Sequence, residues 1–251
     1  MIEIRGLHKV YPSRSASVVA LEDVSFAVRE REFLSIVGPS GCGKSTILRL
    51  ILGLLPKTQG EILFKGAPIA GTQFGMGMVY QAPTLLPWRT VTENVLFPLE
   101  MHGRKVAPFR RRAQELIRSV GLQGFEDKYP HELSGGMQQR TALCRALIED
   151  PAVLLMDEPF AALDALTRER LNLEMLRIWT ETQKTVVFVT HSVEEAVFLS
   201  DRIVVMTPRP GRVASTVDIE LERPRTLETK NRPRFVDHVS DIKSRLMQFV
   251  A

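Results

Sequence analysis

The sequence predicts an α/β fold with a mainly parallel sheet, and three observations support this. Strand-like segments alternate with helix-like segments along most of the chain. Four strand-like segments are short apolar runs, as expected of strands that are covered on both faces: 33–37, 153–156, 186–190 and 203–206. Two of these runs are followed directly by residues suited to phosphate or metal binding, at the sheet edge where such folds bind ligands.

Composition and charge narrow the class of protein. The 251 residues include 44% hydrophobic and 25% charged side chains, enough for a large buried core. The formal net charge of +4 is too small to indicate nucleic-acid binding. The two cysteines, Cys42 and Cys144, cannot form the disulfide framework of a small secreted protein. We identify neither a signal-peptide core nor an apolar run long enough to span a bilayer, so any membrane role is expected to need a partner.

The remaining segments follow in chain order. Apolar and polar residues alternate over 21–28, which predicts a half-exposed antiparallel strand. Helix patterns without a convincing strand extend from about 92 to 150, which predicts a helical subdomain inserted into the sheet domain. Within it one helical face carries the apolar residues Phe109, Ala113, Leu116, Ile117 and Val120. Arg110, Arg111 and Arg112 point elsewhere, and we interpret them as a solvated face.

The second half of the chain contains a further apolar stripe and a polar tail. Leu171, Met175, Ile178 and Trp179 recur at helical spacing, which is typical of core packing. The tail from about residue 218 is charged and contains several prolines, and it ends in a possible helix over 235–250.

The run that ends at Val37 leads into a phosphate-loop motif. Residues 38–45 match G-x-x-x-x-G-K-[ST], between a strand-like run and a helix-like segment. Glycines allow the tight turn that directs backbone N–H groups at phosphates, Lys44 adds positive charge, and the Ser45 hydroxyl can ligate Mg²⁺. We also hypothesise that the Cys42 thiol is accessible when the site is empty and shielded by ATP; the alternative is that Cys42 only fills space as a small residue. The predicted nucleotide-binding residues here are Gly38, Pro39, Ser40, Gly41, Cys42, Gly43, Lys44, Ser45 and Thr46.

The run at 153–156 ends in two acidic residues. Asp157 is the expected Mg²⁺ partner at the carboxyl edge of the sheet. Glu158 follows it and could accept a proton from a water that attacks the γ-phosphate. Together with the phosphate loop, these residues predict a P-loop NTPase.

A second anion-binding helix start is predicted at Ser134, Gly135 and Gly136. Ser134 is a favourable N-cap, and the two glycines leave the N–H groups of the following helix uncovered. One chain thus contains two helix N-termini that are suited to binding phosphate, which suggests that a nucleotide is held between two copies of the chain.

With these motifs in place, the chain resembles ABC transporter ATPases from residue 2 to about 217. Residues 133–140, LSGGMQQR, resemble the family signature, which contacts the γ-phosphate bound by the opposite subunit of a dimer. The resemblance implies a RecA-like sheet core, an antiparallel β subdomain and an inserted helical subdomain at roughly 92–150. Residues 1–217 would form one ATPase domain and 218–251 a short tail. The implied ligands are ATP and Mg²⁺.

The same resemblance assigns roles to four further residues. Gln81 would sense Mg²⁺ and water. The predicted metal ligands are therefore Ser45, Gln81 and Asp157. The predicted catalytic residues are Lys44, Gln81, Glu158 and His191. His191 would contact the γ-phosphate and Tyr11 would stack on adenine. Asp164, in the loop 162–164, would lie at the dimer interface and is also a predicted nucleotide-binding residue.

The resemblance also implies partners and a location. The chain would act as a homodimer with membrane permease subunits and a periplasmic or lipid-anchored solute-binding protein. It would lie peripherally on the cytoplasmic face of a bacterial inner membrane, without nucleic acid. The segments 85–91, 156–160, 162–167 and 208–212 resemble those of importers for nitrate, aliphatic sulfonates or taurine.

Other transport roles stay open at this stage. One is import of another small solute, such as a thiamine pyrimidine precursor, and another is an exporter or lipoprotein-release complex. A non-transport ABC ATPase is less favoured, because the chain has neither a long coiled-coil insertion nor a second cassette. The apolar stretch 85–91 is predicted to dock a permease helix through Trp88, whereas the competing interpretation buries Trp88 inside this chain.

Overall fold

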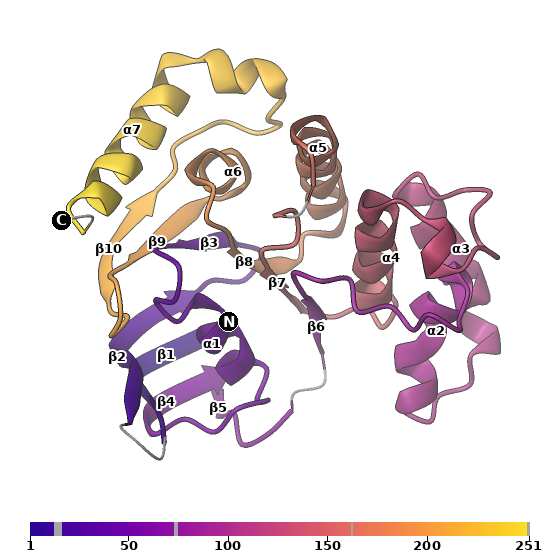
Figure 1. Cartoon of the computed structure of the whole chain (residues 1–251), viewed down its shortest axis with the longest axis horizontal. Coiled ribbons are helices and arrows are strands. Elements are labelled where there is room, and N and C mark those ends of the chain that lie inside the picture. Colours follow the sequence, from indigo (N-terminus) through magenta and orange to yellow (C-terminus); the bar gives the residue numbers. More distant parts are fainter. Residues whose placement is uncertain (13–16, 73–74, 162, 250–251) are drawn as a thin grey trace. The chain divides into compact units, whose positions relative to one another are not determined.

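The computed structural model describes residues 1–12, 17–72, 75–161 and 163–249. The chain divides into two compact units (Figure 1). The first unit comprises residues 1–74 and 176–251, and the second comprises residues 75–175.

An antiparallel sheet in the first unit is built around the N-terminal strand. Its order is β2-β1-β4-β5, with β1 at Ile2–Tyr11, β2 at Val18–Val28, β4 at Gln59–Phe64 and β5 at Ala67–Pro68. β2 confirms the antiparallel strand predicted at 21–28, although it begins three residues earlier. Its apolar residues Val24 and Val28 are fully buried, which is why the alternating pattern was visible in the sequence.

Parallel strands form the buried centre of the first unit. β3 (Phe33–Val37) pairs in parallel with β8 (Thr185–Val189) and with β9 (Arg202–Met206), and β10 (Val213–Asp218) runs antiparallel to β9. All five residues of β3 and all five of β8 are buried. These strands confirm three of the predicted apolar runs, with ends shifted by at most one residue.

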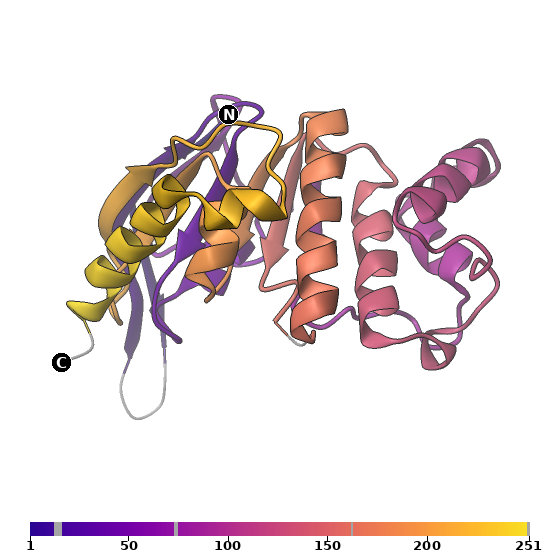
Figure 2. The ribbon, with the colours of Figure 1, turned by 90° about the horizontal axis from the view of Figure 1, so that it is seen from above.

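The second unit joins two parallel strands to a group of helices. β6 (Met76–Val79) pairs with the buried β7 (Val153–Asp157), which confirms the fourth predicted run. The helices α2 (Val91–Met101), α3 (Arg110–Ser119) and α4 (Gly135–Leu147) pack against one another (Figure 2). Residues 92–150 contain no strand, as predicted. The sequence analysis did not identify β1, β4, β5, β6 or β10.

Local chemistry sets the ends of these helices. Thr90 caps α2 in a reciprocal capping box with Glu93: the Glu93 N–H donates to Thr90 Oγ1 at 3.3 Å, and the Thr90 N–H donates to Glu93 Oε2 at 2.8 Å. At the C-terminal end of α4, the Leu147 carbonyl accepts a hydrogen bond of 3.1 Å from Arg112 Nη2, which belongs to α3. The arginine run is therefore not a uniform solvated face as predicted: Arg110 and Arg111 are exposed, whereas Arg112 anchors α4 to α3.

Helix α5 (Ala165–Thr182) carries the predicted apolar stripe. Leu171, Met175, Ile178 and Trp179 are between 1% and 6% exposed, which confirms their assignment to core packing. Trp179 Nε1 donates to the Lys184 carbonyl at 2.9 Å, so the buried indole also satisfies its polar group.

Two arginines bind the C-terminal tail to the rest of the first unit. Arg225 is 5% exposed, and it donates hydrogen bonds of 2.9–3.1 Å to the Val197, Phe198 and Ser200 carbonyls, at the end of α6 (Val193–Leu199). Burial lowers the pKa of Arg225 to about 10, which still leaves the guanidinium charged at neutral pH. The last helix, α7 (Pro233–Met247), lies beside α6 (Figure 2) and confirms the helix predicted near 235–250.

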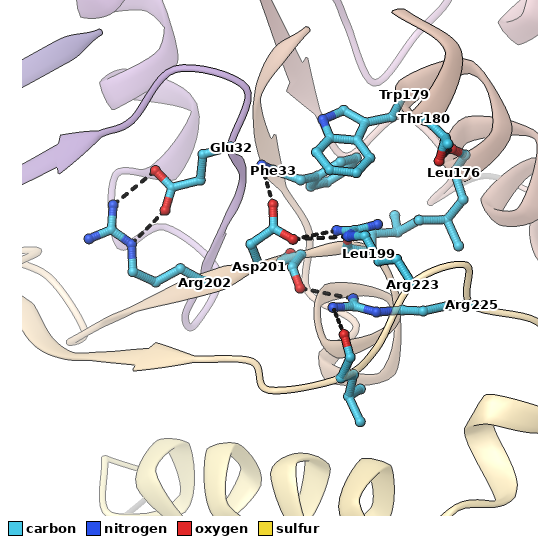
Figure 3. Close-up of polar contacts among 12 residues, drawn as sticks. Glu32, Phe33, Leu176, Trp179, Thr180, Leu199, Asp201, Arg202, Arg223 and Arg225 are labelled. Carbon is cyan, nitrogen blue, oxygen red and sulfur yellow. Dashed lines mark hydrogen bonds and ion pairs between the residues drawn. The ribbon is translucent and has the colours of Figure 1, made fainter. Parts of the chain in front are cut away.

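Arg223 extends this attachment to β3 (Figure 3). Its Nε and Nη2 donate to Asp201 Oδ1 at 3.0 and 2.7 Å, and Asp201 Oδ2 accepts the Phe33 N–H at 2.9 Å. The Arg223 guanidinium also lies 4.0 Å from the centre of the Trp179 ring. The tail thus donates hydrogen bonds to backbone carbonyls at the end of α6. It also binds Asp201, which accepts the backbone N–H at the start of β3.

Removing the buried guanidinium should destabilise the protein. Arg225→Met leaves carbonyls at the end of α6 without their donor, so we expect a loss of about 2–4 kcal/mol in the free energy of unfolding. Urea unfolding measures it. The matched control is Arg234→Met, an exposed arginine of the same tail, which should change stability by less than about 0.5 kcal/mol. Equal unfolding midpoints for the two variants would contradict this role of Arg225.

Candidate functional site

The phosphate loop leaves the buried end of β3 and turns into α1 (Lys44–Ile51). Gly43 caps that helix with φ = 100°, a left-handed conformation that favours glycine. A Cβ atom at Gly43 would also lie 2.5 Å from Leu21 Cδ2, so any other residue would have to displace the Leu21 side chain of β2. Ser40 and Gly41 form the exposed tip of the loop.

The start of α1 has the electrostatics of an anion site. No side chain among the described residues caps it, and its first turn contains no acidic residue. Lys44 is 5% exposed, and its Nζ donates to the Gly38 and Pro39 carbonyls at 2.8 and 3.0 Å. The loop therefore surrounds the Lys44 ammonium group. The backbone N–H groups at the start of α1, which has no side-chain cap, lie next to it. These features fit a polyphosphate.

Cys42 does not have the accessible thiol that we hypothesised. Its side chain is fully buried, with Sγ 3.9 Å from Lys44 Nζ. Burial raises the pKa of the Cys42 thiol, and the Lys44 charge offsets this only in part. The side chain fills space inside the unit, so Cys42 could meet a phosphate only through its backbone.

Tyr11, at the end of β1, lies next to the phosphate-loop helix. Its hydroxyl is 3.3 Å from Thr46 Oγ1, in the first turn of α1. Lys9 Nζ lies 5.0 Å from the centre of the Tyr11 ring and donates to the Pro56 carbonyl at 2.7 Å. The structure thus brings the predicted adenine-stacking residue together with Thr46, a predicted phosphate-loop residue.

His191 follows β8 in the first unit and has an exposed side chain. Its neighbours are fixed on both sides. Thr190 Oγ1 donates to Glu195 Oε2 at 2.6 Å, and Ser192 caps α6 by accepting the Glu195 N–H at 3.3 Å. The His191 imidazole therefore lies on a turn whose two neighbouring residues, Thr190 and Ser192, form hydrogen bonds with Glu195 of α6.

Asp157 and Glu158 lie at the end of β7 in the second unit. Asp157 is 6% exposed and Glu158 is half-buried. Glu158 has φ = 44°, a left-handed conformation that costs a non-glycine residue on the order of 1 kcal/mol. Strained backbone directly after a buried strand is typical of functional sites.

Ser134 caps α4, as predicted, and accepts the Met137 N–H at 3.3 Å. The two glycines that follow have different environments. Gly135 is exposed, whereas Gly136 is buried, and a Cβ atom there would lie 2.9 Å from Thr167 Cγ2. Close packing against α5 is therefore an additional reason for glycine at residue 136.

Asp164 and Gln81 are the remaining predicted residues, and both are exposed. The Asp164 carboxylate accepts the Thr167 N–H at 3.0 Å, and this hydrogen bond lowers the pKa of Asp164. Ala162, the first residue of the predicted interface loop, lies outside the described residues. Gln81 follows β6 after one residue and begins a connection that continues to Thr90.

Sequence reasoning missed the side chains that hold this connection, residues 80–90, which we call the 80–90 segment. Gln139 and Arg145 of α4 and Asn94 of α2 donate to its carbonyls. All three are polar residues of helices, and Asn94 and Gln139 are almost fully buried. The sequence carried no signal that singled them out, because both helices contain other polar residues and burial is known only from the fold.

The predicted site residues are divided between the two units. The first unit contains the phosphate loop, Tyr11 and His191, and the second contains Gln81, Ser134–Gly136, Asp157, Glu158 and Asp164. None of the described helices is both long and apolar enough to cross a membrane.

Comparisons with known proteins agree with the predicted class. The ABC transporter family model matches residues 21–161. The chain is 52% identical to an uncharacterized ABC transporter ATP-binding protein of Methanocaldococcus jannaschii, over 89% of this chain and 84% of that protein. It is 45% identical to a taurine import ATP-binding protein of a Jannaschia species, over 88% and 84% of the two chains. It is 41% identical to an aliphatic sulfonates import ATP-binding protein of Bacillus cereus, over 90% and 88%.

Solved structures show the same fold. A dimeric bacterial ABC transporter cassette is similar with a TM-score of 0.79 and 33% identity, over 88% of this chain and 100% of that one. A dimeric ATP-binding cassette in a post-hydrolysis state, bound to ADP and Pi, has a TM-score of 0.78 and 32% identity over the same shares. The predicted α/β P-loop fold class is thereby confirmed.

The buried thiols lead to a simple chemical test. Cys42 and Cys144 are both buried and burial raises the pKa of each, so alkylation of the native protein should be at least about 100-fold slower than that of the unfolded chain. Thiol titration and peptide mass spectrometry measure both rates. MgATP should make little difference to the native rate. Rapid modification of Cys42 that MgATP slows would restore the accessible thiol of the original hypothesis.

Proposed function

This chain belongs to the ABC transporter family, and we propose that it is the ATP-hydrolysing subunit of an importer for a small sulfonate, taurine or an aliphatic sulfonate. The supporting observation is its 41–45% identity, over about nine-tenths of the chain, to ATP-binding proteins named for taurine and aliphatic sulfonate import. Nitrate and a thiamine pyrimidine precursor are alternative solutes. These names favour import over export or lipoprotein release.

The proposed reaction is hydrolysis of ATP to ADP and phosphate. The phosphate loop, residues 38–46, binds the phosphates through backbone N–H groups and the Lys44 ammonium, and Tyr11 stacks on adenine. Ser45, Gln81 and Asp157 would hold Mg²⁺, which would supply positive charge to the phosphate oxygens. Glu158 takes the proton from water as the water oxygen attacks the γ-phosphorus. His191 contacts the γ-phosphate. The bond between the γ-phosphorus and the bridging oxygen breaks, and ADP leaves with that oxygen on its β-phosphate.

Two copies of the chain complete each site in this proposal. Ser134, Gly135 and Gly136 of one copy approach the γ-phosphate bound by the other, and Asp164 lies at the interface. The capped start of α4 and the exposure of Ser134, Gly135 and Asp164 support this arrangement. The two similar cassettes are both described as dimeric.

The dimer is proposed to drive permease subunits from the cytoplasmic face of the membrane, with a solute-binding protein on the other side. Residues 1–217 form the ATPase domain with its inserted helical part near 92–150, and 218–251 form the tail. Trp88 supports the permease contact, because its side chain is 70% exposed. The competing interpretation, in which Trp88 packs inside this chain, is wrong.

Glu158→Gln tests both the base and the dimer. The amide retains size and hydrogen bonding but cannot accept the proton, so turnover should fall by roughly 100-fold or more while ATP still binds. The variant should also accumulate as an ATP-held dimer in size-exclusion chromatography. The control is Glu222→Gln, an exposed acid of the tail that should behave as wild type. Near-normal hydrolysis by Glu158→Gln would exclude the assignment.

Trp88→Ala tests the permease contact in the assembled transporter. Because the indole is exposed, the isolated subunit should fold and hydrolyse ATP normally, whereas the complex should assemble poorly or lose most of its uptake. Uptake is measured with taurine, an aliphatic sulfonate and nitrate, so wild type also identifies the solute. The control is Met247→Ala, an exposed apolar residue of the tail. Normal uptake by Trp88→Ala would remove Trp88 from the interface.

A further inference from the structure

The 80–90 segment is attached to α4 on both sides of Gln81. Gln139, which is 3% exposed, donates from Nε2 to the Tyr80 carbonyl at 3.0 Å. Arg145 lies further along the same helix and reaches the segment beyond Gln81. Its Nη2 donates to the Pro83 carbonyl at 2.8 Å, and its Nη1 donates to the Thr84 carbonyl at 2.8 Å.

The Arg145 contact depends on the shape of the guanidinium. A planar fork with two outward N–H groups can bind two adjacent carbonyls at once, which an ammonium cannot do in the same geometry. Thr84 has φ = 47°, and its Oγ1 accepts a third hydrogen bond from Nη2 at 3.1 Å. Arg145 therefore fixes a backbone turn that a non-glycine residue seldom adopts.

Asn94 fixes the far end of the segment to α2. Its side chain is fully buried; Oδ1 accepts the Leu86 N–H at 2.8 Å, and Nδ2 donates to the Leu86 and Arg89 carbonyls at 3.1 and 2.9 Å. Trp88 lies between these two anchored residues and projects into solvent. The backbone around an exposed aromatic side chain is thus held by hydrogen bonds from two helices.

Helix α4 connects this anchored segment to the proposed interface with the second copy. It runs without a break from the cap at Ser134 to Leu147, and Arg145 lies about three turns from its start. We propose that Arg145 is a coupling residue, a positioning side chain that makes α4 and the 80–90 segment move as one body. Movement of the Ser134 end on ATP binding is then transmitted to Trp88. This inference rests on the proposed function.

The bond from Gln139 to Tyr80 is separate from the Arg145 contact, so the two can be perturbed independently. Losing Arg145 leaves Tyr80 held by Gln139 and the residues around Trp88 held by Asn94, and it frees only the turn at Pro83 and Thr84 between them. The basal hydrolysis of the isolated subunit should then persist, while the link between hydrolysis and transport weakens. A merely stabilising side chain would instead lower both activities together.

The experiment uses the complete transporter in vesicles with Arg145→Met, Arg145→Lys and a matched control. Arg112→Met is the control, because Arg112 also binds a carbonyl of α4, that of Leu147, and its hydrogen bonds among the described residues do not involve the 80–90 segment. Each variant is measured for thermal unfolding, basal ATP hydrolysis of the subunit, and taurine or sulfonate transported per ATP hydrolysed. Arg145→Met should keep hydrolysis within about twofold and lower the transport per ATP about tenfold, as expected for the loss of charged hydrogen bonds. Arg145→Lys should fall between Arg145→Met and wild type.

The results separate this inference from the proposed function. Unchanged transport per ATP in Arg145→Met overturns the inference, and so does an equal loss in Arg112→Met or a parallel loss of both activities. If Arg145→Met does not fold, Arg145→Lys decides by the same criteria. Normal transport by both Trp88→Ala and wild type would instead show that the permease contact itself was wrongly placed.

Discussion

Strand β3 is buried along its whole length between two parallel neighbours, and most of the first unit is organised by that burial. The backbone of a strand in this position must form hydrogen bonds on both edges, so β3 is fixed by β8 and β9, which lie far away in the sequence. The phosphate loop follows directly after the last residue of β3, so the start of the loop is fixed in position by the strand. Gly43 can then hold its left-handed conformation against Leu21 of β2, and α1 starts at one defined position.

Charged residues complete the same frame at the opposite end of β3 (Figure 3). Asp201 accepts the Phe33 N–H and binds Arg223, while Glu32, the residue before β3, forms an ion pair with Arg202 at 2.8 Å. Glu32 is 5% exposed, so its carboxylate depends on this partner. The first unit therefore relies on arginines from the end of the chain, and the tail is part of its packing rather than an appendage.

The sequence predicted the elements whose pattern is local. Uniform burial made β3, β7, β8 and β9 recognisable, and the motifs placed the phosphate loop, Ser134 and the acid pair. β6 was missed because the segment Met76–Val79 is only four residues long and contains a glycine. Cys42 was misjudged since a loop position alone does not reveal whether a side chain turns inward. The contacts of Arg112, Arg145 and Arg225 could not be predicted, because each depends on carbonyls more than 20 residues away or on a helix end that only the fold defines.

The division of the first unit into two stretches of chain has a consequence for synthesis on the ribosome. Residues 75–175 emerge as a continuous unit, whereas β3 emerges early and waits for β8 and β9, about 150 residues later. At roughly 5–20 residues per second, this leaves an apolar strand without neighbours for about 8–30 seconds. Unpaired apolar strands promote association between chains. The nascent protein is therefore most exposed to aggregation before its last quarter has been made, and chaperones that bind apolar segments would act on it in that interval.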